Sequence, residues 1–221
     1  MCGRFVRKGE PKKITEFLGV KDGEENWTES YNVAPSAAIP IVTADQSGRH
    51  LVTAVWGFAS PGGRPLFNAK GGTVDSLPSF RDALRLNRCL VPASGFYEWR
   101  PRDKQPFYFE RVDEQPLAFA GIWKQVGSHL QATIITTNPS ADIIDIHHRM
   151  PVILLEKSWD GWLSPHQLSK QQRHQLLAPT APNTLKSWPV SRSVGSVRNN
   201  ESRLILPVQV SPSEETEELF Q

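Results

Sequence analysis

The fold class is set by residues 88–137, which read RCLVPASGFYEWRPRDKQPFYFERVDEQPLAFAGIWKQVGSHLQATIITT. This stretch contains five short apolar runs separated by polar turn residues, glycine and proline: 88–92, 96–100, 107–111, 117–123 and 130–137. Such runs, rich in aromatic and β-branched side chains, are typical of β-strands. The run Phe107-Tyr108-Phe109 alternates only weakly between apolar and polar, so we expect strands that are covered on both faces.

Strands are also predicted outside this stretch, by apolar or extended segments at 31–35, 39–43, 51–58, 151–155 and 204–208. Helices are predicted where apolar residues recur at helical spacing, at 11–20, 79–86 and 167–177. The sequence therefore predicts an α+β fold, a single domain with a curved, mostly antiparallel, barrel-like β core flanked by a few helices.

We expect this domain to span residues 1–210, because no internal repeat and no long linker divides it. Residues 211–221 hold four glutamates and no lysine or arginine, which predicts an acidic, disordered tail. The formal net charge of the chain is +2, and without the tail 25 basic and 19 acidic side chains leave +6. This excess is compatible with a phosphate-binding groove, and equally with an ordinary solvated surface.

Composition excludes several classes of protein. The apolar fraction of 38% and the charged fraction of 22% are ordinary for a globular protein. No apolar run is long enough for a membrane span or a secretory signal, so we expect a cytoplasmic protein without a membrane partner. Two cysteines exclude a disulfide framework. No CxxC, HExxH or P-loop pattern occurs, so neither a metal nor another cofactor is predicted.

The amino terminus reads Met1-Cys2-Gly3-Arg4-Phe5. A methionine before a small residue is usually trimmed, and trimming would leave Cys2 with a free α-amine beside its thiol. This 1,2-aminothiol condenses with an aldehyde to an imine, and the thiol then closes a thiazolidine ring. Both groups titrate close enough to neutral pH to react. The alternative is an incidental thiol at a chain end, whereas Cys89 lies in an apolar run and is expected to be buried and inert.

Polar clusters mark the ends of several predicted strands, where functional sites are commonly built. They are Cys2-Gly3-Arg4, Tyr31-Asn32, Phe67-Asn68-Ala69-Lys70, Gly95-Phe96-Tyr97-Glu98-Trp99 and Asp145-Ile146-His147-His148-Arg149. Together with Trp56-Gly57 and Pro189-Val190-Ser191, they resemble in content and order the motifs of the SRAP family (SOS-response-associated peptidase domain) from residue 1 to about residue 207.

This resemblance implies an abasic-site sensor of the DNA damage response. Such a protein forms a covalent thiazolidine crosslink with abasic sites in single-stranded DNA through Cys2, after autocatalytic removal of Met1. It implies peptidase-like and lyase-type chemistry in one monomer, acting in the cytoplasm at nucleoid DNA. An abasic deoxyribose is in equilibrium with an open-chain aldehyde, which is the functional group that a 1,2-aminothiol captures.

The resemblance also implies roles for individual residues. Cys2 is the nucleophile, Glu98 the general acid/base, His147 a proton donor or acceptor for the sugar, and Asn68 an amide that holds the Cys2 amine or the sugar. Because Glu98 lies between Tyr97 and Trp99, we expect a raised pKa for its carboxyl. His148 is the alternative histidine, and no third ligand at suitable spacing supports a zinc site.

DNA contacts follow from the same motifs. Arg4, Lys70 and Arg149 are expected to meet phosphates, and three further residues are expected to line the DNA channel: Asn32, Trp56 and Thr136. Trp56 would stack on a base, although a core aromatic residue is an equal alternative. The chain departs from the family where Lys70 replaces an arginine and Gly72 a glutamate. Lysine keeps the charge without the bidentate fork, and Gly71-Gly72 makes this loop more mobile.

Two rival functions use the same residues. A cysteine or N-terminal-nucleophile peptidase that acts on other proteins would need Cys2, Glu98 and His147 equally. A non-covalent nucleic-acid binding module would retain its binding without Cys2 and lose it at high salt. The sequence identifies no protein partner.

Overall fold

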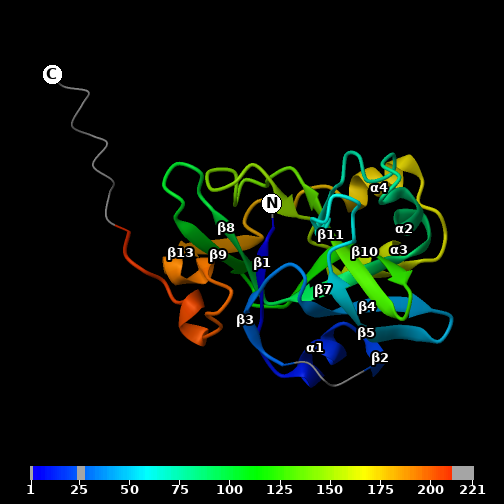
Figure 1. The fold of residues 1–221 in the computed structure, drawn as a ribbon, viewed down its shortest axis with the longest axis horizontal. Helices are drawn as coiled ribbons and strands as arrows, with labels where there is room; N and C mark the ends of the chain where they lie inside the picture. Colours follow the sequence, from blue (N-terminus) through cyan, green and yellow to red (C-terminus); the bar gives the residue numbers. More distant parts are fainter. Residues whose placement is uncertain (1, 24–27, 211–221) are drawn as a thin grey trace.

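The computed structural model describes residues 2–23 and 28–210. The predicted acidic tail, 211–221, lies outside the described residues. The described strands form two sheets that stand side by side, a larger one that closes into a barrel and a smaller five-stranded one (Figure 1).

The barrel consists of β4 (Ala38–Asp45), β5 (Gly48–Trp56), β7 (Arg88–Ala93), β10 (Leu117–Val126) and β11 (His129–Thr137). Neighbours in the order β11-β10-β7-β4-β5 are antiparallel, and a parallel pairing between β5 and β11 closes the ring. In that pairing Val55 lies opposite Gln131 and Trp56 opposite Ala132. Short strands extend the sheet, namely β2 (Val20–Gly23), β6 (Asn68–Lys70) and β12 (Met150–Pro151). The predicted α+β class with a barrel-like core is confirmed.

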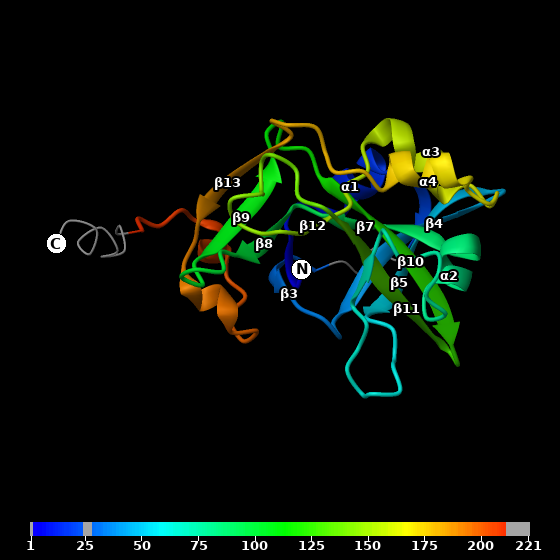
Figure 2. The same ribbon diagram turned by 90° about the horizontal axis from the view of Figure 1, so that it is seen from above.

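The five-stranded sheet has the order β13-β9-β8-β1-β3, and all its neighbours are antiparallel. Its strands are β1 (Arg4–Arg7), β3 (Ser30–Val33), β8 (Gly95–Trp99), β9 (Pro106–Arg111) and β13 (Leu185–Pro189). Figure 2 shows this sheet beside the barrel, with the first strand at the junction between the two. The chain thus begins its folded course between the two sheets.

Apolar packing joins the two sheets. The rings of Phe5 from β1 and Phe96 from β8 contact Phe119 from β10, with centroids 6.0 and 5.9 Å apart. All three side chains are fully buried. A fully buried aromatic ring contributes about 3 kcal/mol or more to stability, so this contact holds β1 and β8 firmly against the barrel.

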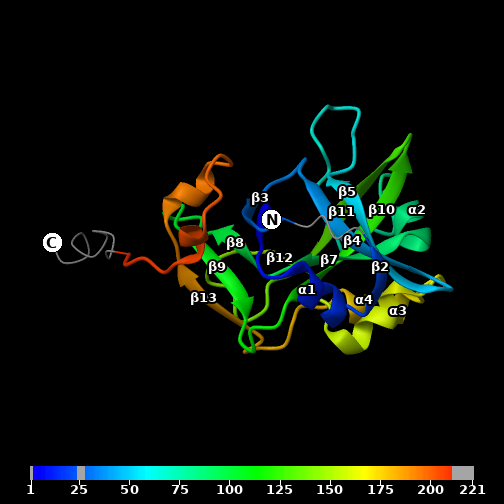
Figure 3. The ribbon, with the colours of Figure 1, turned by 90° about the horizontal axis from the view of Figure 1, so that it is seen from below.

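Helices cover the other side of the barrel (Figure 3). They are α1 (Pro11–Phe17), α2 (Arg81–Leu86), α3 (Trp159–Leu163) and α4 (Lys170–Leu176). The outer face of the five-stranded sheet packs against the short 3₁₀ helices η2 (Arg192–Gly195) and η3 (Ser202–Ile205). A third 3₁₀ helix, η1 (Glu156–Ser158), leads into α3.

Three local predictions were wrong. Residues 204–208 form the end of η3 and one isolated bridge, between Val190 and Pro207, instead of a strand, because only Leu204 of this segment is buried. Residues 151–155 contribute Pro151 to β12 and an isolated bridge between Ile153 and Phe119 instead of a continuous strand, because their backbone bonds to β11 at Val152 and to β10 at Val152 and Leu154. Helix α3 was not predicted, because its five residues are too short to show a period.

Gly95 marks the closest approach between β8 and β9. A Cβ at this position would lie 2.5 Å from the carbonyl oxygen of Phe109 and would overlap the hydroxyl of Tyr108. We therefore expect Gly95→Ala to lower the free energy of unfolding by about 1–3 kcal/mol, because the backbone of β9 must move. Urea denaturation would measure this loss, provided that the slope m of unfolding free energy against urea concentration is the same in both proteins.

Gly161→Ala is the matched control for this substitution. Gly161 lies within α3 and a Cβ there would meet nothing within 4 Å, so alanine should raise stability by about 0.5–1 kcal/mol. Equal and small effects at both positions would contradict the close approach at Gly95.

Candidate active site

The first residues of the chain are positioned by the pairing of β1 with β8. Arg4 lies opposite Tyr97 and Phe5 opposite Phe96. Continued by one residue, this register sets Gly3 at the level of Glu98, so Cys2 enters the sheet beside that carboxyl group. Cys2 is fully buried. Burial raises the pKa of its thiol well above the ordinary value, and the charge of Glu98 raises it further.

Glu98 is the most perturbed carboxyl group of the site. Strand alternation puts its side chain on the same face of β8 as Phe96, toward the barrel, and it is 2% exposed. Burial raises its pKa from 4.5 to about 7. The expected shift is present, but its cause differs from the prediction. Tyr97 and Trp99 pack in the opposite layer, so the desolvation comes from the face toward the barrel.

Asn68 holds the backbone of Cys2. It begins β6, which runs parallel to β11 with Asn68 opposite Ile134. Its Nδ2 donates to the carbonyl oxygen of Cys2 at 2.8 Å. Its Oδ1 is buried and has no hydrogen-bond partner among the described residues. This amide therefore presents an unused acceptor beside Cys2.

His147 brings a second titratable group to Glu98. Its Nε2 lies 3.7 Å from Oε2 of Glu98, beyond direct hydrogen-bond reach, and its Nδ1 lies 2.9 Å from the carbonyl oxygen of Arg149. In the tautomer that donates to this carbonyl, the Nε2 lone pair faces Glu98. Burial lowers the pKa of His147. Desolvation thus favours the neutral form of both groups. In this state the Glu98 carboxyl carries a proton and Nε2 of His147 carries none.

Arg149 forms the edge of this cluster. Its Nη2 donates to the carbonyl oxygen of Thr136 at 2.6 Å and to Oγ1 of the same residue at 3.1 Å, while Nη1 donates to Oδ1 of Asn138 at 3.0 Å. Thr136 was expected to line a DNA channel. It is fully buried, and in this structure it orients Arg149. Asn138 was not singled out, although a polar residue at the end of a strand is a usable signal.

Arg4 and Asn32 are placed differently from their expected roles. Asn32 is buried, and its Nδ2 donates to the carbonyl oxygens of Ser196 and Asn199 at 2.9 and 2.8 Å. Arg4 donates to Oδ1 of Asn32 at 3.1 Å and to the carbonyl oxygen of Val194 at 2.7 Å. Both side chains tie the carboxy-terminal segment to the five-stranded sheet. This placement does not fit an open DNA channel at Asn32, and it engages the guanidinium of Arg4 within the protein.

Trp56 is a core residue. It is fully buried, and its Nε1 donates to the carbonyl oxygen of Phe67 at 2.9 Å. Of the two alternatives for Trp56, base stacking does not fit this burial and core packing does. The contact has a consequence for the site, because Phe67 directly precedes Asn68. Trp56 therefore fixes the start of β6, which sequence reasoning did not foresee.

Lys70 and Gly72 lie at the exposed end of β6. Lys70 pairs in register with Thr136, and the next amide, of Gly71, donates to the carbonyl oxygen of Thr136 at 2.8 Å. A Cβ at Gly72 would meet nothing within 4 Å. Lys70 thus lies close to the segment that orients Arg149, with its side chain exposed.

The structure brings Cys2, Asn68, Glu98 and His147 into one cluster, with Arg149 at its edge. His148 is exposed, and its ring lies 4.5 Å from that of His147. In the described part of the chain no three His, Cys, Asp or Glu side chains are grouped as a metal site would require. Among the helices of the described residues, none has the length and apolarity of a membrane span.

This cluster has the groups needed for acid/base and nucleophilic chemistry. It contains a sulfur nucleophile, a carboxyl with a pKa of about 7, an imidazole, and an amide with an unused acceptor. The carboxyl is close enough in pKa to neutrality to give and take a proton with little driving force.

Comparison with known proteins agrees with the family resemblance seen in the motifs. A family model described as SOS response associated peptidase (SRAP) matches residues 1–197. The abasic site processing protein YoqW of Bacillus subtilis (strain 168) is 35% identical, over 93% of this chain and 99% of that protein. The abasic site processing protein YedK of Escherichia coli (strain K12) is 31% identical, over 94% and 100%.

The fold has solved counterparts as well. A crystal structure of a protein from Bacteroides thetaiotaomicron superposes with a TM-score of 0.82 and 25% sequence identity, covering 94% of this chain and 100% of that one. The family match includes every residue of the cluster around Cys2. The chain belongs to the SOS response associated peptidase (SRAP) family.

Proposed function

We propose that this protein captures abasic sites in single-stranded DNA as a covalent thiazolidine through Cys2, after autocatalytic removal of Met1. The observation that carries the proposal is the place of Cys2, held between Asn68 and the buried carboxyl of Glu98. The names of the relatives, abasic site processing proteins, support DNA as the partner. We further propose that it acts as a cytoplasmic monomer at damaged DNA.

The proposed chemistry balances with the groups at hand. Hydrolysis of the Met1–Cys2 peptide bond consumes water and releases methionine. The freed α-amine adds to the aldehyde carbon of the opened deoxyribose, and loss of water gives an imine. The Cys2 sulfur then adds to the imine carbon, its proton passes to the imine nitrogen by way of Glu98, and the five-membered ring closes.

The residues around Cys2 divide these steps among them. Because burial keeps the thiol protonated, sulfur attack is coupled to proton transfer to Glu98. His147 exchanges a proton with the sugar hydroxyl as the ring opens, and the unused Oδ1 of Asn68 accepts from the amine or the sugar. Lys70 and Arg149 contact the flanking phosphates.

Cys2→Ala should abolish the covalent product, because both the sulfur and the ring closure depend on this residue. Intact-mass measurement of the unaltered protein should show loss of one methionine and then a mass gain with an abasic oligonucleotide. Cys89→Ala is the matched control and should retain the adduct, since Cys89 is a buried core residue. A denaturant-resistant adduct formed by Cys2→Ala would contradict the proposal. Turnover of peptides in trans, without DNA capture, would favour the peptidase.

Glu98→Gln should slow crosslinking by about a hundredfold or more, since the general base is lost. The unaltered protein should react faster as pH rises through about 7, where the Glu98 carboxyl ionises, and this dependence should vanish in the variant. Single-turnover rates from pH 5.5 to 8.5 would test this.

Stability should change in the opposite direction. Between pH 4.5 and about 7 the folded state holds a proton on Glu98 that the unfolded chain has released, so stability falls as pH rises through this window. Above it, Glu98→Gln should be more stable than the unaltered protein by up to about 3 kcal/mol. Equal stabilities at pH 8 would show that the carboxyl is not desolvated.

Lys70→Ala should weaken binding to single-stranded DNA and lower the salt dependence of log K by about 0.7, the value for one phosphate contact. Lys70→Arg should bind as well or better, since the guanidinium restores a bidentate contact. Fluorescence anisotropy at several salt concentrations would measure both. An unchanged affinity of Lys70→Ala would remove Lys70 from the DNA contacts.

A further inference from the structure

We propose that a groove between the Gly71–Gly72 loop and α4 binds the phosphate backbone of the DNA strand where it leaves the Cys2 cluster. The groove has a volume of about 430 Å³. Its walls include Arg149 and the loop on one side, and Lys170, Arg173 and His174 of α4 on the other. This inference rests on the proposed function and adds a second contact region for the same strand.

The groove is continuous with the catalytic cluster through Arg149. The backbone of Arg149 contacts Nδ1 of His147, while its side chain lines the groove. The Nε of this guanidinium is buried without a hydrogen-bond partner among the described residues. The carbonyl oxygen of Thr136 accepts from both Arg149 and the Gly71 amide, so one acceptor ties the two parts of this wall to each other.

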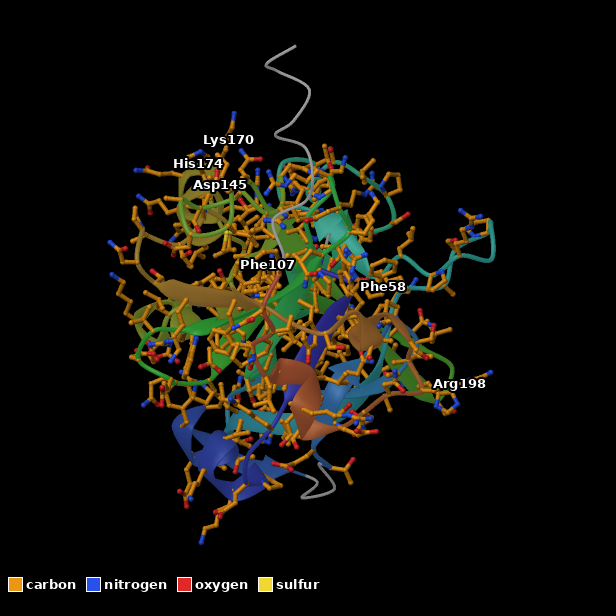
Figure 4. The ribbon with its side chains drawn as sticks, turned by 90° about the vertical axis from the view of Figure 1, so that its left-hand side faces the viewer. Phe58, Phe107, Asp145, Lys170, His174 and Arg198 are labelled. Carbon is orange, nitrogen blue, oxygen red and sulfur yellow. The ribbon has the colours of Figure 1, made fainter. Side chains whose placement is uncertain are left out.

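The positive charge along α4 has no structural explanation within the helix. Lys170 is the first residue of α4, and the first turn holds no acidic residue. A cation at this end is mildly unfavourable to a helix. Lys170 and His174 are exposed and make no ion pair among the residues that the structure describes. Figure 4 shows both side chains at the upper edge of the molecule.

Arg173 is held in place by a counter-charge. Its Nη2 lies 2.5 Å from Oδ2 of Asp75, which also lines the groove. This pair keeps the guanidinium in the wall but cancels its charge. Asp75 therefore lowers the attraction of the groove for an anion, and the net attraction comes from Arg149 and Lys170.

Glycine leaves part of the groove lining without side chains, while Leu177, Ala178 and Pro179 add an apolar part. A Cβ at Gly71 would lie 3.2 Å from the carbonyl oxygen of Thr136, tighter than an ordinary contact, and one at Gly72 would enter open space. The glycine pair lets the backbone of a ligand approach the loop closely. A groove that combines cationic side chains, a bare stretch of backbone and an apolar part suits a sugar–phosphate chain, whose phosphates meet the cations and whose sugars meet the apolar side chains.

The test uses oligonucleotides with a tetrahydrofuran abasic analogue, which has no aldehyde, so that equilibrium binding is measured without capture. One oligonucleotide is short around the analogue, and two others extend it on the 5′ or the 3′ side. Lys170→Glu should lower the affinity for one extended oligonucleotide by about tenfold at ~0.1 M salt. The affinities for the short oligonucleotide and for the other extended one should stay unchanged.

Asp75→Asn provides a test of opposite sign. It removes the counter-charge of Arg173 at nearly constant shape, so it should tighten binding of the same extended oligonucleotide severalfold. Lys12→Glu is the matched control for the reversed charge, because Lys12 is exposed and belongs to α1, which lies away from α4 in Figure 1. It should bind every oligonucleotide as the unaltered protein does.

The outcomes separate the groove from the proposed function. Covalent capture of an aldehyde-bearing abasic oligonucleotide is measured in parallel. If the unaltered protein captures it but Lys170→Glu binds all lengths normally, the groove is not a DNA contact although the function stands. If no variant or wild-type protein captures DNA, the function itself fails. A loss of binding in both Lys170→Glu and Asp75→Asn would overturn the assignment of a DNA strand to the groove. The assignment would also be overturned if polyglutamate displaced the extended oligonucleotide as effectively as unlabelled DNA does.

Discussion

The antiparallel pairing of β1 with β8 is the constraint on which the rest of the site depends. It brings the start of the chain next to Glu98, a buried carboxyl that lies 96 residues after Cys2 in the sequence. Because side chains alternate along a strand, a slip of one residue would turn Glu98 out of the interior. The Phe5, Phe96 and Phe119 contact opposes such a slip, since each ring is buried only in the observed register.

One physical effect, desolvation, sets the protonation of all three reactive groups. It raises the pKa of the Cys2 thiol and of the Glu98 carboxyl and lowers that of His147, so each group is favoured in its neutral form. A resting site of this kind carries little charge and keeps its sulfur as a thiol, which oxidises slowly. Glu98, with a pKa of about 7, exchanges its proton readily at neutral pH.

The fold class and the five strands β7–β11 could be predicted from the apolar runs of residues 88–137, since each run is a local pattern. The closure of the barrel could not, because the parallel pairing of Val55 with Gln131 joins segments far apart in the sequence. Motifs identified Cys2, Asn68, Glu98 and His147 as a group. Asn32, Trp56 and Thr136, which were expected to line a DNA channel, are buried. The sequence could not predict this, because a motif does not say which face of a strand a side chain takes. No sequence motif marks the cationic residues of α4.

The hydrogen bonds by which Arg4 and Asn32 tie the carboxy-terminal segment to the five-stranded sheet have a consequence for folding during protein synthesis. Besides the bond from Arg4 to Asn32, these side chains, on the first and third strands, donate to carbonyl oxygens of residues 194–199. Until residues 194–199 have been synthesised, those carbonyls are absent and this tie between β1, β3 and the later segment cannot form. The segment that carries Cys2 therefore gains these hydrogen bonds only after most of the described chain has been made, although it is translated first.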